Sequence, residues 1–432
     1  MKISFSFFNL AKLFLYLFLI FIPFQLSTLV FYEQIYFSGF FNPYLSHLLY
    51  LKDIFLFLIL FFFFLSYLFE DRIKKISFGD KKLLLILFLL LLFACFSLFF
   101  ASNFNNSIFY ILRFIELIFI YLVLINKIIE PKRILIIIIS VFSLAAFVGI
   151  LQYLLQGSIG LDFLGEPIIS QDVPGISKIK LSNSVILRPY SFFPHPNIFA
   201  GFLLFNIFII YFLVKKSKGD EKILLYLLLF VSFLALFLTF SRSAFLAIFG
   251  GWVVYFTLSN LKIDLKKVFF IGFLIIIVFS FFDLNSVFLS RTNLIGSESS
   301  SERIELLRVS KYMVLDNYLG VGIGNFTDIM QEYSQDKLMP WEFQPVHNIY
   351  MLILNEQGIL SLFLYLFLFY YIASYLLAKK TDFNLILISI GFSFLIIGFF
   401  DHYFISLYQG QLLLFIYLSL FSLNQEKGFD NH

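Results

Sequence analysis

The chain has 432 residues, of which 61% are hydrophobic and 13% charged, and its formal net charge is +4. A typical soluble domain is about 45–50% apolar and about 25% charged, so this composition excludes a soluble enzyme and a disordered protein. The apolar runs are long rather than alternating, which argues against an outer-membrane barrel and favours a polytopic α-helical membrane protein.

Apolar runs separated by polar breaks predict about twelve transmembrane helices. The first run is expected to be a span rather than a cleaved signal peptide, because no small-residue cleavage site precedes the polar residues after Phe31. The expected limits are 10–31, 49–69, 83–101, 107–126, 133–155, 197–214, 222–240, 244–259, 267–283, 348–378, 383–400 and 404–423.

The basic residues set the expected orientation. With the N-terminus in the cytoplasm, five short connections on that side hold 17 of the 31 basic residues. An excess of Lys and Arg in cytoplasmic loops is the usual pattern in membrane proteins. Both termini are therefore expected in the cytoplasm, and two long connections, 156–196 and 284–347, on the outer face.

These elements divide the chain into five expected parts. Two groups of spans, 1–155 (helices one to five) and 197–283 (helices six to nine), are each followed by a long outer loop. Residues 348–432 hold the last three spans and a short cytoplasmic tail. The second loop contains amphipathic pieces, so we expect it to be partly helical.

Ionisable residues at the membrane are costly and tend to mark functional sites. The first candidates are Arg188, His195 and Asn197, in the segment RPYSFFPHPN before the sixth span. Two prolines stiffen the backbone around His195. For His195 and Asn197, a rigid loop with a capping Asn is the favoured interpretation, and a role in the site is the alternative.

The second group is Ser241, Arg242 and Ser243, in the short connection between the seventh and eighth spans. Arg presents several donors in a fixed fork and stays charged, and two flanking hydroxyls suit it to a phosphate. The alternative is an interfacial Arg that extends to the headgroups.

The third group is His347 and Asn348, at the expected start of the tenth span. A neutral imidazole at this place could act as a general base. Two further groups are expected to be structural. We expect Asp401-His402-Tyr403 to form a solvated turn. We expect Arg113 and Glu116 to form an ion pair within the fourth span.

Several motifs are absent from the sequence. It has no phosphate loop, no DxD and no HExxH, and its single cysteine, Cys95, excludes an intramolecular disulfide and a cysteine-based metal site. No nucleotide site, cofactor, nucleic-acid partner or bound metal is therefore expected. Two Arg and one His on the outer face indicate an anionic substrate that arrives already activated.

Four segments together resemble the O-antigen ligase family, which shares a domain with O-antigen polymerases and bacterial protein O-oligosaccharyltransferases. They are Arg188 to Asn197, the SRSA at 241–244, the stretch SERIELLRVSKYMVLDNYLGVGIGNF and HNIYMLILNEQG at 347–358. A ligase pattern has His, then Asn, Ser or Gln, nine residues, Gly, two residues, then Gly, Thr or Tyr. This chain matches it up to Gly358 and has Ser361 at the last position.

The resemblance implies an all-α, polytopic glycosyltransferase of the GT-C type with a large, partly helical periplasmic loop. It implies a metal-independent, inverting transfer of a whole glycan from undecaprenyl diphosphate to a sugar hydroxyl of lipid A–core, at the periplasmic face of the bacterial inner membrane. Arg188 and Arg242 would hold the donor diphosphate and His347 would activate the acceptor. His195, Asn197, Ser241, Ser243 and Asn348 are the expected substrate-binding residues.

Three alternatives remain open from the sequence. A polymerase of the same superfamily would lengthen the lipid-linked glycan, and a protein O-oligosaccharyltransferase would transfer it to protein. A lipid or glycan transporter is the non-enzyme alternative, although its ionisable groups should line a path through the midplane. The sequence identifies neither the glycan, the acceptor sugar nor the oligomeric state.

Overall fold

The computed structural model describes residues 6–31, 36–37, 40–70, 75–180, 185–259, 298–427 and 429. The span expected at 267–283, and the first part of the second long loop, lie outside these residues. Helices dominate the described part: α1 (Phe7–Ile20), α2 (Leu51–Phe69), α3 (Lys81–Ser97), α4 (Phe104–Ile125), α5 (Pro131–Leu155), α6 (Pro196–Lys216), α7 (Gly219–Leu238), α8 (Arg242–Leu258), α11 (Glu298–Asp316), α12 (Phe326–Tyr333), α13 (Ile349–Leu377), α14 (Asp382–Gly398), α15 (Tyr403–Ser406) and α16 (Tyr408–Lys427).

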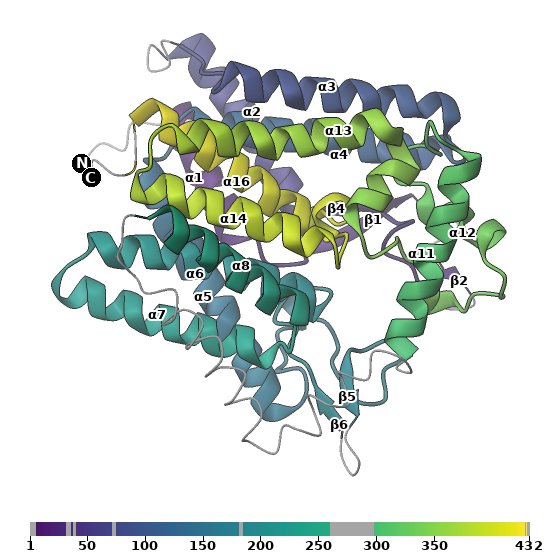
Figure 1. Ribbon diagram of the computed structural model, residues 1–432. Helices are drawn as coiled ribbons and strands as arrows, with labels where there is room; N and C mark the ends of the chain where they lie inside the picture. The colour runs from purple at the N-terminus through teal and green to yellow at the C-terminus, as the bar shows by residue number, and fades with distance from the viewer. Residues whose placement is uncertain are drawn as a thin grey trace.

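Within the described residues, seven helices are long and apolar enough to cross a membrane: α2 to α7 (α3 together with the short turn that follows it) and α13. The shorter helices α1, α8 and α14 are also apolar. The expected class, a mostly helical multi-pass membrane protein, is thus supported. Figure 1 shows the long helices lying side by side, with α11 and α12 at the end of the molecule opposite the two termini.

The expected first span, 10–31, is wrong in its second half. Helix α1 ends at Ile20, and the chain then forms strand β1 (Ser27–Phe31), which pairs antiparallel with β4 (His47–Tyr50). Pro23, close after the helix end, cannot supply an N–H to continue it. The apolar run from 10 to 31 therefore includes both a helix and a strand, which hydrophobicity alone does not separate.

The remaining strands are short hairpins in the connections. Strand β2 (Tyr36–Phe37) pairs with β3 (Phe40–Phe41), and β5 (Lys178–Lys180) pairs with β6 (Val185–Leu187). The second hairpin aligns Ile179 with Ile186. It places Arg188 directly after a strand end, close to the start of α6.

Helix α6 is the central element of the bundle. In its most apolar window 94% of the residues are buried, compared with 22% in α7. It packs against α5, α7, α8 and α14. Because α6 begins at Pro196, its first turn is held by packing on every side, and the residues before it are fixed with it.

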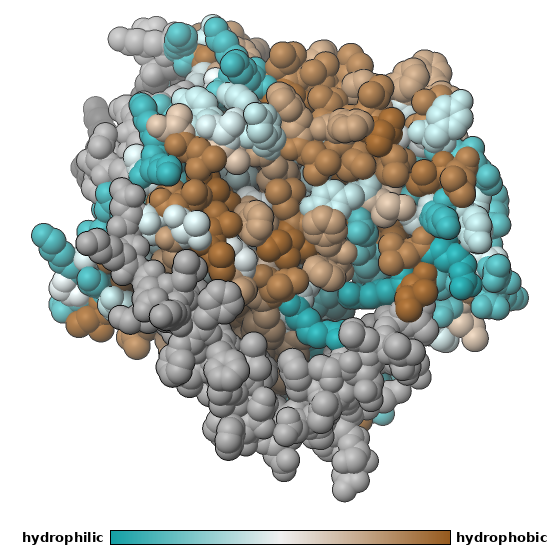
Figure 2. Space-filling view, viewed as in Figure 1, coloured by the Kyte–Doolittle hydropathy of each residue, from teal (hydrophilic) through white to brown (hydrophobic). Residues whose placement is uncertain are grey.

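The surface in Figure 2 has a hydrophobic middle and hydrophilic ends. Brown side chains cover the flank formed by the long helices, whereas teal ones gather over α11 and α12. This banding is what a lipid-facing flank between two aqueous faces requires. It identifies the α11–α12 end as one aqueous face of the molecule.

Helix α13 is kinked at Gly358, where φ is 79° and ψ is −179°. The kink frees carbonyls that a straight helix would use: Asn355 O accepts from Val321 N at 2.9 Å, and Glu356 O accepts from Gly322 N at 3.0 Å. Gly320, Gly322 and Gly324 all have positive φ, as expected for a close backbone approach. This contact ties α11 and α12 to the first turns of α13.

The ion pair expected in α4 is confirmed and is part of a larger cluster. Arg113 contacts Glu116 and, at 2.9 Å, Asp53 at the start of α2. Tyr408 donates to Glu116 at 2.7 Å and lies under the Arg113 guanidinium. These contacts join α2, α4 and α16 and satisfy buried charges.

Candidate active site

Arg188 is buried, with a relative exposed area of 4%. Its Nε donates to Thr239 O at 2.6 Å, Nη1 to Ser177 Oγ at 2.7 Å and Nη2 to Asn197 Oδ1 at 2.8 Å. The guanidinium therefore joins the end of α7 to the start of α6. Protein atoms engage all three of its nitrogens, which is the pattern of an organising residue.

The expected cap of α6 is wrong by two positions. His195, not Asn197, is the N-cap, and its Nδ1 accepts from Asn197 N at 3.1 Å. The Asn197 side chain instead bridges two charged groups, accepting from Arg188 and donating through Nδ2 to Asp401 Oδ2 at 3.1 Å. Pro196 at the first helical position leaves the chain extended at His195 and lets an imidazole take the cap.

The expectation of a solvated turn at Asp401-His402 is also wrong. Asp401 is 5% exposed and His402 2%. Asp401 N bonds back to Ile397 O at the end of α14, and its Oδ1 accepts from His402 N at 2.9 Å. The turn is buried because α6 and the start of α13 cover it, which no local pattern reveals.

His347 lies next to this buried aspartate. Its Nδ1 is 3.9 Å from Asp401 Oδ1, and its ring centroid is 5.0 Å from that of His402. The side chain is 18% exposed, so one edge of the ring reaches solvent. A series of side-chain contacts thus connects a buried cation to a partly exposed imidazole, in the order Arg188, Asn197, Asp401, His347.

Asn348 is the N-cap of α13, and its Oδ1 accepts from Met351 N at 3.0 Å. Capping of this kind is the ordinary role of an Asn at a helix start. The cap fixes the first turn of α13 and, with it, the position of His347 immediately before it.

Arg242 is the first residue of α8, and its side chain is exposed. Ser241 Oγ and Ser243 Oγ lie 3.3 Å apart beside it. Phe240, with φ of 50°, turns the chain sharply between α7 and α8. The connection expected to hold Arg242 at the membrane surface is therefore a tight turn, and its end is fixed by Arg188 through Thr239 O.

Arg303, on α11, is a candidate that the sequence interpretation missed. Its positive charge acts on Arg242, His195 and His402, so it lies within electrostatic range of these groups. Helical spacing could have indicated it, because residues three apart share a face of a helix and Arg303 is three residues before buried Leu306. Arg308, in contrast, pairs with Glu305 on the exposed side. The charge of Arg303 thus reaches both Arg242 and the two histidines.

Burial and charge set the protonation of the site. Burial, with a smaller contribution from the Arg188 cation, lowers the pKa of His195 to about 3. Burial, His347 and Arg303 likewise lower the pKa of His402 to about 3. Burial acts to raise the pKa of Asp401, but its interactions with the histidines, His347 above all, lower it overall. At neutral pH the site therefore holds a carboxylate and two neutral imidazoles.

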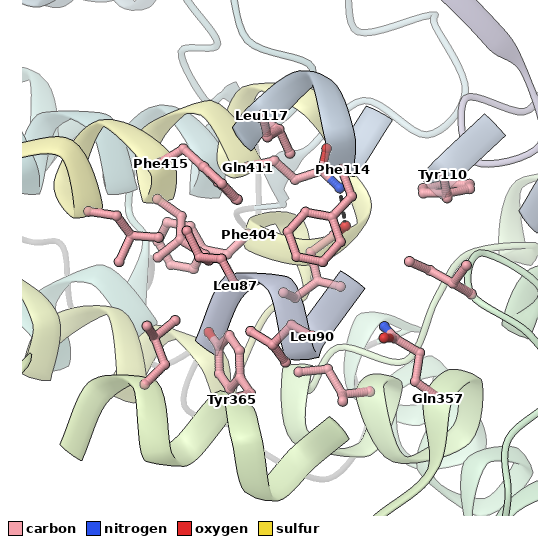
Figure 3. Close-up of a pocket in the computed structure, with 16 residues that line it drawn as sticks. Leu87, Leu90, Tyr110, Phe114, Leu117, Gln357, Tyr365, Phe404, Gln411 and Phe415 are labelled. Carbon is pink, nitrogen blue, oxygen red and sulfur yellow. Dashed lines mark hydrogen bonds between the residues drawn. The ribbon is translucent and has the colours of Figure 1, made fainter. Parts of the chain in front are cut away.

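A small apolar cavity lies beside the site, between α3, α4, α13 and α16 (Figure 3). Phe404 and Ile405, which follow His402 closely, are part of its wall. Figure 3 shows Tyr110, Tyr365, Gln357 and Gln411 as the polar side chains among the labelled lining residues. The cavity offers no charged group and is suited to hydrocarbon.

The structure brings most of the predicted site residues together. Arg188, Asn197 and His347 are linked through Asp401, and His195 caps the adjoining helix. Arg242 and its two serines follow the turn that Arg188 holds through Thr239 O, and the charge of Arg303 acts on Arg242. Among the described residues, His347, Asp401 and His402 also offer donor atoms in an arrangement that could hold a metal ion.

Residues 227–366 match the family model described as O-antigen ligase. The match includes Arg242, Arg303 and His347, and it confirms the resemblance inferred from the sequence motifs. No curated protein matches the chain.

Proposed function

We propose that this member of the O-antigen ligase family transfers a glycan en bloc from undecaprenyl diphosphate to a sugar hydroxyl of lipid A–core. The observation that carries the proposal is the pairing of His347 with buried Asp401, beside the cations Arg242 and Arg303. An imidazole oriented by a carboxylate is suited to remove a hydroxyl proton. Cations beside it are suited to a diphosphate leaving group.

In the proposed reaction the acceptor hydroxyl attacks the anomeric carbon of the donor sugar. A new C–O bond forms as the bond from that carbon to the diphosphate oxygen breaks on the opposite face, so the configuration inverts. The proton passes to Nε2 of His347, because Nδ1 faces Asp401. The long 3.9 Å separation is compatible with a contact that tightens when substrate binds.

Arg242 and Arg303 would stabilise the charge that builds on the departing diphosphate. Fixed cations that match a developing charge lower the barrier most effectively in a site from which water is excluded. The transfer then needs no metal ion, because the two guanidiniums neutralise the leaving group. Ser241 and Ser243 add hydroxyl donors next to Arg242.

Arg188 has a different role in this proposal. Its contacts to Thr239, Ser177 and Asn197 make it a positioning residue that holds Asn197 against Asp401. Asn197 and His195 then shape the wall of the site, and Asn348 fixes the first turn of α13.

The membrane setting follows the sequence interpretation. We propose about twelve spans in a GT-C-type arrangement, with both termini cytoplasmic and the site at the periplasmic face of the inner membrane. The location of α11 and α12 opposite the termini is in accord with this orientation (Figure 1). Undecaprenyl diphosphate and lipid A–core are both membrane-anchored, and the small cavity near His402 presents an apolar lining to such chains.

Complementation tests this function. The gene is expressed in a ligase-deficient strain whose lipid-linked glycan is otherwise intact, as wild type and as His347→Ala. We expect capped lipopolysaccharide with the wild type, and with the variant uncapped core and accumulated undecaprenyl-linked glycan. Single repeat units on the core after deletion from the native host would indicate a polymerase, and loss of glycoproteins alone a protein transferase. Translocation without a new glycosidic bond would indicate a transporter.

A further inference from the structure

Three metal-ligating side chains meet in the proposed site. His347 comes from the start of α13, and Asp401 and His402 come from the connection between α14 and α15. One ring nitrogen of each histidine and one carboxylate oxygen lie within 4.8 Å of one another. Nδ1 of His347 is buried and has no hydrogen-bond partner among the described residues, and it faces Asp401 Oδ1 at 3.9 Å.

The neighbours of these side chains orient them as the outer ligands of a metal site do. His402 Nδ1 lies 2.5 Å from Ser406 Oγ, which leaves Nε2 available as a donor atom. Asp401 Oδ2 accepts from Asn197 Nδ2 at 3.1 Å, and Oδ1, which also accepts from His402 N at 2.9 Å, faces His347. Metal-binding histidines and carboxylates usually have such partners, which fix ring orientation and tautomer.

The donor set selects a class of ion. Two imidazoles and one carboxylate suit Zn²⁺, whereas Mg²⁺ and Ca²⁺ prefer oxygen ligands. With bonds of about 2.0–2.2 Å, tetrahedral ligands lie about 3.4 Å apart. His347 Nδ1 and Asp401 Oδ1 need to approach by about 0.5 Å to reach this separation, and donor atoms as far as 4.8 Å apart need to approach by about 1.4 Å. Because His347 reaches solvent, a fourth position stays open.

We propose that His347, Asp401 and His402 form a Zn²⁺ site, and that the bound ion inhibits glycan transfer. The inhibitory part rests on the function proposed above for His347. A neutral imidazole bound to metal through Nδ1 carries its proton on Nε2, so neither nitrogen can accept the acceptor's proton. Zn²⁺ therefore removes the base while leaving the protein folded.

The nearby cations limit the affinity. The charge of Arg303 acts on both His402 and Arg242, so a divalent ion bound here is placed in a field of like charge. A bound diphosphate would neutralise the two guanidiniums. We therefore expect Zn²⁺ to bind more tightly when the donor is present than when it is absent.

The test uses the purified full-length protein in detergent. Zn²⁺ alone is titrated by calorimetry, in separate experiments with wild type, His402→Ala and His47→Ala. His47 is the matched control, because it is also buried but stacks on Phe109 away from the site. We expect one Zn²⁺ to bind per chain in the wild type and in His47→Ala. His402→Ala should bind Zn²⁺ at least tenfold more weakly. Titration of the wild type with Mg²⁺ should release no heat of binding. As a second measurement that needs no variant, Co²⁺ is added to the wild type, and its visible absorption bands show whether it is bound tetrahedrally by nitrogen ligands.

Transfer activity is then measured with added Zn²⁺ and again after chelation. The expected result is inhibition that EDTA reverses and that His402→Ala weakens. Wild-type transfer with neither Zn²⁺ binding nor Co²⁺ bands would overturn the metal site and leave the proposed function intact. Stoichiometric binding to a protein that transfers no glycan even without Zn²⁺ would instead overturn the function and leave the site. Equal binding by wild type and His402→Ala would place the ion elsewhere and overturn the proposal.

Discussion

His347 Nδ1 lies 3.9 Å from Asp401 Oδ1, although the two residues come from different helix connections. Asp401 is in turn held by Asn197. In the proposed reaction the carboxylate orients the imidazole and stabilises the positive charge that it gains. The role of Asp401 can therefore be tested separately from that of His347, the proposed base.

Asp401→Asn should lower kcat by roughly 10²-fold, the size of a lost contribution to proton transfer, and change KM for the donor little. The amide keeps the shape but loses the charge that favours a protonated ring. Steady-state transfer kinetics measure the effect, and a thermal melt checks folding. Asp382→Asn, which removes an exposed ion pair with Lys215, serves as the control. An Asp401→Asn enzyme with normal kcat would exclude this role.

Arg303→Ala should reduce transfer by about 10²- to 10³-fold, because one of two cations on the leaving group is lost. Arg308→Ala on the same helix is the matched control, since Arg308 pairs with Glu305 on the exposed side. The measurement is initial rate against donor concentration. If both variants lose activity equally, a general effect of α11 charge explains the result and the assignment of Arg303 fails.

Arg188→Lys should lower thermal stability and kcat together, because lysine cannot hold Thr239, Ser177 and Asn197 at once. Each hydrogen bond to a charged group contributes about 1.5–3 kcal/mol. The melting temperature, measured in detergent, is compared with that of Arg133→Lys, a control at an exposed ion pair with Glu130. A raised KM for the donor with unchanged stability would show instead that Arg188 binds the diphosphate.

Gly358→Ala should destabilise the first part of α13 by about 1–3 kcal/mol, since an L residue at φ of 79° and ψ of −179° is strained. The added Cβ would also lie 3.1 Å from Leu319 O. Gly157→Ala, whose Cβ meets its nearest atom at an ordinary 3.5 Å, is the control. Equal melting temperatures for the two variants would argue against the kink as a structural requirement.

Glu70 gives a pH-dependent prediction. Burial acts to raise the pKa of Glu70, but hydrogen bonds from Phe7 N, Ser66, Phe8 N and Ser6 lower it overall. Because the folded pKa is depressed, the carboxylate stabilises the contact between α1 and α2 above its unfolded pKa of about 4.3. This contribution is lost as the pH falls through the folded value.

Glu70→Gln should therefore melt at a lower temperature than wild type at pH 7, and the difference should shrink below about pH 4. Glu130→Gln, which removes an exposed pair with Arg133, is the control and should show little difference at either pH. A difference that grows towards acid pH would contradict the assigned sign.

Much of the helical plan could be predicted from sequence, because a span needs only local hydrophobicity. The strand at 27–31 could not, since its pairing with β4 depends on residues further along the chain. Some residues of the site could likewise be predicted from the sequence, and others could not. His347 and Arg242 stand out as polar residues beside apolar runs, whereas Asp401 and His402 resemble an ordinary turn until α6 and α13 bury them. Arg303 resembles any charge on an amphipathic helix until the fold brings it within electrostatic range of Arg242.

The central claim is that His347 activates a hydroxyl for glycan transfer from undecaprenyl diphosphate. Its most direct test is a reconstituted assay with purified protein, undecaprenyl-diphosphate-linked glycan and lipid A–core, read out by the mass of the acceptor. We expect acceptor carrying the whole glycan with wild type and with His47→Ala, and none above background with His347→Ala. Transfer by His347→Ala at the wild-type rate would contradict it.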